Sequence, residues 1–165
     1  MASTQTWTEY NGATAATATA SRTEANWKNI DDSTTAYSAS PITAGNNSFD
    51  KNQAVVYGGT WNTLSALTYK VSTATPGTGL NIVASVRSAG VTPTATASGD
   101  ATASTTGTAA NFASISTGFA VGAATATGSG VYYGQVYRTQ LQTTVAAAPG
   151  DLASAVTITA TWTES

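Results

Sequence analysis

The sequence contains no cysteine and no histidine. Without cysteine the chain has no disulfide, no thiol nucleophile and no thiolate metal site, so its stability has to come from packing and backbone pairing. Without histidine it lacks the commonest general base, which excludes a Ser-His-Asp triad and an ordinary zinc site. These two absences argue against an enzyme, and we expect no catalytic residue, no cofactor and no metal.

Charged residues are also scarce, at 8% of the chain against roughly 25% in an average soluble domain. The 6 basic and 8 acidic residues give a net charge of −2, and the basic ones are scattered singly. Binding to nucleic acid or to an anionic membrane needs clustered lysine and arginine, so we expect neither partner. Threonine, alanine, serine and glycine dominate instead, and solubility has to come from hydroxyl groups.

Long apolar runs are missing as well. No uninterrupted stretch approaches the roughly 20 residues of a membrane-spanning helix, and the N-terminus shows neither the basic region nor the apolar run of a signal peptide. We therefore expect a protein made in the cytoplasm. A length of 165 residues is enough for one domain with a real core and too short for two ordinary ones, so residues 1–165 should form a single domain.

The clearest pattern that is present lies at the C-terminus. From Ala155 to Thr163, apolar residues alternate strictly with threonines, which is the periodicity of a strand with one buried and one solvated face. The apolar row ends in Trp162. Because this strand comes last, it has to pair with earlier segments, and the turn at 148–151 predicts Val131–Val145 as its antiparallel partner.

Further strands are predicted by alternation in several segments that are bounded by turn residues such as Asn11-Gly12. About eight short strands and no convincing helix predict an all-β fold, a single antiparallel β-sandwich of jelly-roll or Ig-like type. Residues 24–32 fit either a helical turn or a strand. The segments with the clearest strand pattern are Thr4–Tyr10, Gln53–Tyr57, Leu67–Ser72, Leu80–Arg87 and Val131–Val145.

Some segments carry too little apolar bulk to order themselves on their own domain. Residues 1–6 are expected to form a flexible N-terminal arm, and Ala13–Ala20 an extended or loop-like stretch. Pro93–Thr108 has no aromatic and no large aliphatic residue, which predicts a long surface excursion or, alternatively, a small-residue strand pair at a sheet edge. If these segments are ordered, a neighbouring subunit has to supply the burial that offsets the entropy cost.

Large side chains are few, so the core is expected to depend on a small set of anchors. Each of the four tryptophans would bury about 150 to 250 Å² of surface, which favours a core role over an aromatic platform for a ligand. The expected core anchors are Trp7, Trp27, Trp61, Tyr137, Leu141, Ile158 and Trp162.

Two clusters of oxygen-bearing side chains have the chemistry to hold a hard cation. Neither has the spacing of a calcium loop, and we interpret both as Asx residues that cap turns through their own backbone. No two carboxylates are marked as a pair for glycoside hydrolysis. The two clusters are Asn29 with Asp31-Asp32, and Asn46-Asn47 with Asp50.

Two longer stretches carry a family resemblance. The first holds Tyr37, Pro41-Ile42, Gly45-Asn46-Asn47-Ser48-Phe49, Lys51, Gly59 and Trp61-Asn62, and the second holds Arg138-Thr139-Gln140-Leu141-Gln142, Ala148-Pro149-Gly150-Asp151-Leu152 and the ending Trp162-Thr163-Glu164-Ser165. Together they cover about half of the chain and resemble small virion structural proteins of tailed bacteriophages. Members of that family often end on an aspartate-glutamate pair, where this chain has Thr163-Glu164. The resemblance implies a component of the virus particle.

We therefore predict a virion structural protein, a capsid decoration or cement protein whose partners are the major capsid protein and copies of itself. A tail or fibre-associated module is the alternative within the same particle. A carbohydrate-binding β-sandwich is another alternative, in which Trp27, Trp61, Tyr132 and Tyr133 would stack on a surface glycan. An exported pilin-like or adhesin-like subunit, suggested by the threonine-rich and alanine-rich composition, would require a leader.

Overall fold

The computed structural model describes residues 3–61, 63–72, 77–87, 119–120, 128–129, 132–133, 136–148 and 157–165. Within these residues the chain forms β-strands and two single turns of 3-10 helix, with no α-helix. The predicted all-β class is confirmed. The two helical turns are η1 (Ala13–Ala15) and η2 (Tyr37–Ala39).

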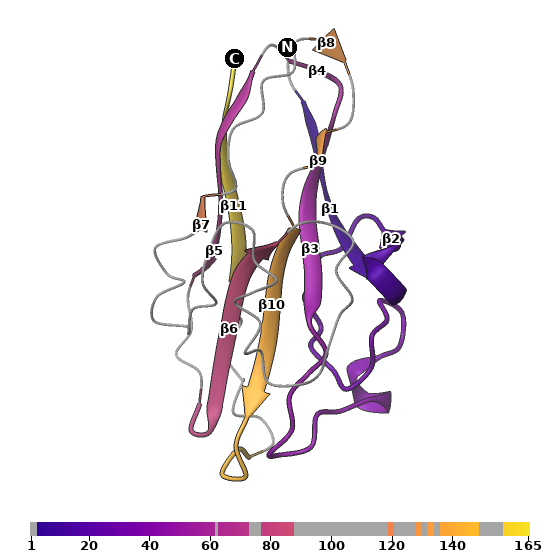
Figure 1. Cartoon of the computed structure of the whole chain (residues 1–165), viewed down its shortest axis with the longest axis vertical. Coiled ribbons are helices and arrows are strands. Elements are labelled where there is room, and N and C mark those ends of the chain that lie inside the picture. The colour runs from indigo at the N-terminus through magenta and orange to yellow at the C-terminus, as the bar shows by residue number, and fades with distance from the viewer. Residues whose placement is uncertain are drawn as a thin grey trace.

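The strands form two main antiparallel sheets (Figure 1). The larger sheet has the strand order β2-β1-β3-β10-β6, with β9 also paired to β3, and the smaller sheet has the order β11-β5-β7. A separate pair, β4 with β8, lies beyond the end of β3. The strands are β1 (Thr4–Asn11), β2 (Thr17–Thr19), β3 (Lys51–Gly58), β4 (Thr60–Trp61), β5 (Leu64–Ser72), β6 (Leu80–Arg87), β7 (Phe119–Ala120), β8 (Gly128–Ser129), β9 (Tyr132–Tyr133), β10 (Val136–Thr143) and β11 (Thr157–Glu164).

The two sheets pack against each other through aromatic side chains, which makes the fold sandwich-like. Tyr69 of β5 stacks on Tyr137 of β10, with ring centroids 5.3 Å apart, and lies 5.6 Å from Trp7 of β1. Tyr57 of β3 meets Trp162 of β11 edge to face at 5.4 Å. Each of these contacts joins one sheet to the other, and such pairs contribute about 0.5 to 1.5 kcal/mol beyond the area they bury.

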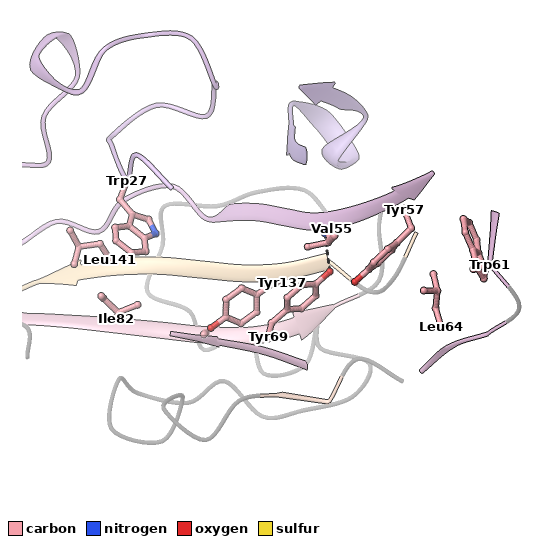
Figure 2. Packing of buried hydrophobic residues seen from close by; sticks show 10 residues of the cluster. Trp27, Val55, Tyr57, Trp61, Leu64, Tyr69, Ile82, Tyr137 and Leu141 are labelled. Carbon is pink, nitrogen blue, oxygen red and sulfur yellow. Dashed lines mark hydrogen bonds between the residues drawn. The ribbon is translucent and has the colours of Figure 1, made fainter. Parts of the chain in front are cut away.

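Tyr69 also completes the hydrogen bonding of the larger sheet. β10 pairs with β3 from Lys51 to Gln53, whereas β9 pairs with β3 only at Val56 and Tyr57. Val55 lies between these two ladders, and its backbone N–H donates instead to the Tyr69 hydroxyl at 2.9 Å (Figure 2). A buried backbone donor is thereby satisfied by a side chain from the opposite sheet.

The predicted core anchors all lie in or against one hydrophobic cluster (Figure 2). Four of them, Trp27, Trp61, Tyr137 and Leu141, are buried within it. The other three, Trp7, Ile158 and Trp162, are partly buried and pack against it.

The predicted pairing of the last strand with segment 131–145 is wrong. β11 pairs with β5, from Thr157 opposite Ser72 to Glu164 opposite Leu64. The reason is that both edges of β10 are already occupied, by β3 on one side and by β6 on the other. The chain therefore changes sheets between β10 and β11 instead of forming a hairpin, as strands of sandwiches commonly do.

Several boundaries differ from the predicted ones. The long strand expected over Val131–Val145 is divided into β9 and β10. Residues 24–32, with Trp27, form neither a helical turn nor a strand, and Ala13–Ala20 contains both η1 and β2. β6 has the predicted bounds, because its alternation places Ile82 and Ala84 in the core.

The prediction of a flexible arm over residues 1–6 is wrong for residues 4–6, which belong to a strand. Thr4 lies opposite Gly58 in the ladder of β1 with β3, so β1 begins inside the expected arm. Ser3 donates from its backbone N and its hydroxyl to the two carboxylate oxygens of Glu164, at 2.9 and 2.6 Å. Residues 1–2 and the expected excursion over 93–108 lie outside the described residues.

We predict that Tyr69→Phe lowers the free energy of unfolding by about 1 to 3 kcal/mol, because it leaves the buried Val55 N–H without its acceptor. Tyr37→Phe is the matched control: the residue is 49% exposed, and the change should stay within about 0.5 kcal/mol. Urea unfolding followed by tryptophan fluorescence measures both. Equal midpoints for the two variants would contradict the role given to the Tyr69 hydroxyl.

Candidate functional site: a buried polar cluster

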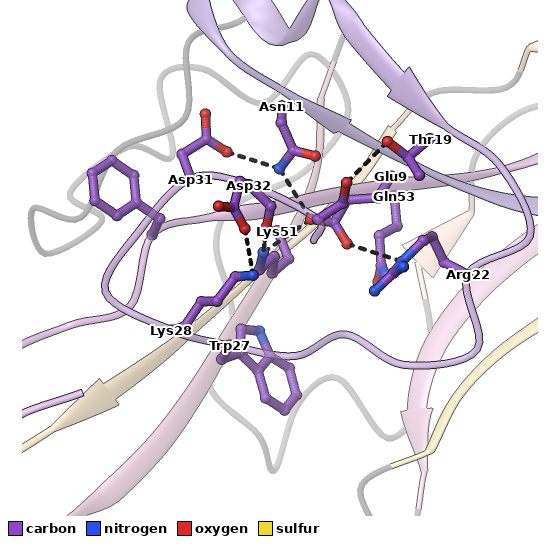
Figure 3. A network of polar contacts seen from close by, with 12 residues as sticks. Glu9, Asn11, Thr19, Arg22, Trp27, Lys28, Asp31, Asp32, Lys51 and Gln53 are labelled. Carbon is purple, nitrogen blue, oxygen red and sulfur yellow. Dashed lines mark hydrogen bonds and ion pairs between the residues drawn. The ribbon is translucent and has the colours of Figure 1, made fainter. Parts of the chain in front are cut away.

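A polar cluster lies on the inner face of the larger sheet, beside its apolar core (Figure 3). Side chains two apart on a strand share a face, so Lys51 and Gln53 of β3 point to the same side as Val55 and Tyr57. Toward the Lys51 end, this face is covered by segment 21–35 instead of the smaller sheet.

Several hydrogen bonds hold segment 21–35 on the sheet. The indole N–H of Trp27 donates to the Thr139 hydroxyl of β10 at 3.0 Å, and the Arg22 backbone N–H donates to the Trp7 carbonyl at 3.0 Å. The sheet and the segment thus enclose charged side chains that the sequence shows as isolated residues. Those charged side chains are Glu9, Arg22, Lys28, Asp32 and Lys51.

Glu9 and Lys51 form the centre of the cluster. Their side chains are both 0% exposed, and Lys51 Nζ donates to Glu9 Oε1 at 2.9 Å. Asn11 Nδ2 donates to the same Glu9 oxygen at 3.0 Å, and Arg22 Nε lies 3.7 Å from Glu9 Oε2. Lys51 Nζ also donates to the Asp32 carbonyl at 2.9 Å. A single buried carboxylate therefore contacts an ammonium, an amide and a guanidinium.

Lys28 and Asp32 form the second ion pair. The Lys28 side chain is 0% exposed, and its Nζ donates to Asp32 Oδ1 and to the Thr35 carbonyl. Asp32 also accepts the backbone N–H groups of Thr34 at 3.2 Å and Thr35 at 3.0 Å, and the Thr35 hydroxyl. The hydrogen bonds from Lys28 and from Thr35 hold the pKa of the Asp32 carboxyl well below its usual range.

The interpretation of Asp31 and Asp32 as residues that cap turns through their own backbone is confirmed for Asp32, whereas Asp31 binds groups about 20 positions earlier in the chain. Asp32 caps its own turn, and Asp31 Oδ2 accepts the Gly12 backbone N–H at 2.7 Å. In the second cluster, Asp50 instead lies 3.6 Å from Arg138, and both of these side chains are buried. No group of three or more acidic, histidine or cysteine side chains that could hold a metal ion occurs in the part of the chain that the structure describes.

Arg138 lies at the middle of a buried polar row on the opposite face of the larger sheet. In the strand register it is opposite Asn52 of β3 and Ser85 of β6, and all three are buried. Gln140, two residues along, donates to the Ser48 carbonyl at 3.0 Å. Tyr137, which precedes Arg138, faces the inner side of the sheet, and its burial there raises the pKa of its phenol.

The sequence did not predict the clusters around Glu9 and Arg138. Their basic residues appear as isolated charges, because Lys51 and Glu9 are 42 positions apart. One signal was present: Glu9 is on the same strand row as Trp7, a predicted core anchor. A charged residue in a core-facing position requires a partner nearby, and that requirement could have identified Glu9 as buried and paired.

Of the aromatic residues considered for a glycan platform, the structure describes the side chains of Trp27 and Trp61, and these two do not form a platform. Trp27 and Trp61 are 7% and 3% exposed, so their faces are covered by the protein's own core. The side chains of Tyr132 and Tyr133 lie outside the described residues.

Comparison with known proteins gives no match: no family model, no curated protein and no solved structure is significantly similar to this chain. Among the described residues there is no helix with the length and hydropathy needed to cross a membrane. The main feature of the described geometry is that buried charges are neutralised by one another.

We predict that Asp32→Asn lowers the free energy of unfolding at pH 7 by about 1 to 3 kcal/mol, less than for a fully buried pair because the carboxylate is 30% exposed. The folded-state pKa of Asp32 is depressed, so its stabilisation is present above the ordinary carboxyl pKa of about 4 and is lost as the pH falls below it.

The pH dependence separates this effect from general damage. Between pH 5 and pH 2, wild type should lose more stability than Asp32→Asn, and the difference between them should shrink as the pH falls. Glu24→Gln, at a side chain 67% exposed, should stay within about 0.5 kcal/mol of wild type at pH 7. Parallel unfolding curves at every pH would contradict the ion-pair explanation.

Proposed function

We propose that this protein is a structural component of a virus particle, a decoration or cement protein that stabilises the capsid shell through contacts with the major capsid protein and with its own copies. It performs no catalysis on an external substrate. The proposal rests on the sequence resemblance and on one feature of the described surface.

That feature is the near absence of exposed charge. Of the charged side chains that the structure describes, only Glu24 is exposed. The exposed positions of β11, for example, are Thr157, Thr161 and Thr163. The charged side chains compared are Glu9, Arg22, Glu24, Lys28, Asp31, Asp32, Asp50, Lys51, Arg138 and Glu164.

An uncharged hydroxyl surface favours association with other proteins. Charged residues are depleted from the cores of protein interfaces, because each buried charge must lose its hydration. A surface with little charge also has little electrostatic repulsion between copies. Conversely, such a surface supplies no field to attract a charged ligand or a nucleic acid. These properties support a role in a permanent assembly.

The location of the protein in the particle tests the proposal directly. Heads and tails would be separated from purified particles and each fraction analysed by mass spectrometry. Presence in heads at many copies supports the capsid role, whereas presence only in tails replaces it with the tail or fibre-associated alternative. Absence from both fractions overturns the proposal.

A binding experiment gives the quantitative prediction. Purified protein should co-sediment with shells assembled without it, and the bound fraction should change less than about twofold between about 0.05 and 0.5 M salt, because few exposed charges are available for screening. A tenfold loss of binding over that range would contradict the assignment of a neutral contact surface. A glycan array serves as the parallel control, since the carbohydrate-binding alternative predicts a positive signal there and the capsid role does not.

A further inference from the structure

Glu9 is placed between two side chains that can react with each other. Its Oε1 accepts hydrogen bonds from Lys51 Nζ at 2.9 Å and from Asn11 Nδ2 at 3.0 Å (Figure 3). A primary amine, a carboxamide and a shared carboxylate are the three groups needed to form an amide bond with release of ammonia. We propose that Lys51 and Asn11 become joined by an intramolecular isopeptide bond, with Glu9 as the catalytic acid and base.

The strand register brings the two reacting groups together. In the ladder of β1 with β3, Glu9 lies opposite Gln53 and Tyr10 opposite Asn52, so the next position places Asn11 across from Lys51. Side chains directly opposite each other on antiparallel strands have Cβ atoms about 4.5 to 5.5 Å apart. Both groups are therefore held on rigid backbone at close range, which removes most of the entropy cost of bringing them together.

Water is excluded from the three groups. The side chains of Glu9 and Lys51 are 0% exposed, and Asn11 is 5% exposed. Asp31 Oδ1 holds the Asn11 amide nitrogen from a second direction at 2.9 Å. The side-chain oxygen of Asn11, Oδ1, is buried and has no hydrogen-bond partner in the described part of the chain.

The reaction balances without any external reagent. The Glu9 carboxylate takes one proton from the Lys51 ammonium, which frees the Nζ lone pair. Nζ attacks Cγ of Asn11, and a tetrahedral intermediate forms. Glu9 then returns a proton to Nδ2, the Cγ–Nδ2 bond breaks, and ammonia leaves. Nζ gives up its second proton to Glu9 as the amide forms. The product is one Nζ–Cγ amide bond, and the carboxylate of Glu9 is regenerated once the released ammonia carries away the remaining proton.

Lys28 is also a buried lysine, but among the described residues it lacks the carboxamide partner that the proposed isopeptide bond requires. Its side chain is as buried as that of Lys51, but its partners are the Asp32 carboxylate and the Thr35 carbonyl, and no carboxamide donates to that carboxylate in the described part of the chain. The inference is thus specific to one lysine, and it does not depend on the proposed role in a virus particle.

Intact-mass measurement and a tryptic map test the proposal on the full chain. We expect the folded protein to be lighter than its sequence by one ammonia. Trypsin cuts after lysine and arginine, so Asn11 lies in the peptide that ends at Arg22. A modified Lys51 resists cleavage, so peptide 1–22 should be found joined to peptide 29–70, as assigned by tandem mass spectrometry.

The tryptic map also distinguishes the crosslink from a competing reaction that causes the same loss of mass. Asn11 precedes Gly12, and attack of the Gly12 nitrogen on the Asn11 side chain forms a succinimide with loss of one ammonia. A succinimide leaves Lys51 cleavable and produces no joined peptides. Ammonia loss without joined peptides therefore overturns the proposal, and so does a full-length mass with none lost.

Variants assign the roles of the three residues. Lys51→Arg, Asn11→Ala and Glu9→Gln should each abolish the joined peptides. Lys70→Arg, at a lysine on β5 of the other sheet, is the matched control and should retain them. Circular dichroism shows whether each variant is folded. Joined peptides at the wild-type level in folded Glu9→Gln would overturn the catalytic role of Glu9, and joined peptides in Lys51→Arg would overturn the assignment of the site. The tryptic map of the wild-type protein alone supports or overturns the presence of the bond. The proposal can therefore be tested even if a variant fails to fold.

Discussion

A charge removed from water needs a partner, and this constraint organises the inner face of the larger sheet. One part of that face is apolar and packs under the smaller sheet through Tyr57, Tyr137 and Tyr69. The other part carries Glu9 and Lys51, which are too polar to pack against an apolar sheet. Segment 21–35 covers this part and supplies the required partners, so an irregular segment completes the second layer.

The same constraint explains why the described surface is nearly uncharged. Six basic and eight acidic residues are few for a chain of 165, and most of those described are used in internal pairs. A buried pair is weak evidence for stability, since apolar residues of similar size often stabilise as well. Here the buried pairs fix the positions of the charged side chains relative to one another. Because those charges are used inside the protein, mainly hydroxyl side chains remain on the described surface. That exterior supports a role in assembly.

The proposed isopeptide bond gives the central pair a chemical consequence. An ion pair holds β1 and β3 together only while both strands are folded, whereas a covalent bond between Asn11 and Lys51 would persist in denaturant. The ion pair and the isopeptide bond require the same arrangement of groups around Glu9. They differ only in whether the covalent bond between Asn11 and Lys51 forms. For the particle component proposed above, a permanent link between strands would increase resistance to unfolding.

The sequence by itself determined the all-β class, the bounds of β6 and part of the set of large side chains in the core, because strand periodicity and side-chain volume are local properties. Tyr57, Tyr69 and Leu64 also lie in that core and were not among the predicted anchors. The sequence also indicated that Asp32 caps its own turn. Only the tertiary structure decided that β11 pairs with β5 and that Lys51 meets Glu9 and Asn11. Alternation specifies which face of a strand is buried, but not which strand lies beside it. That choice depends on which edges are already occupied, and edge occupancy is a property of the whole folded chain.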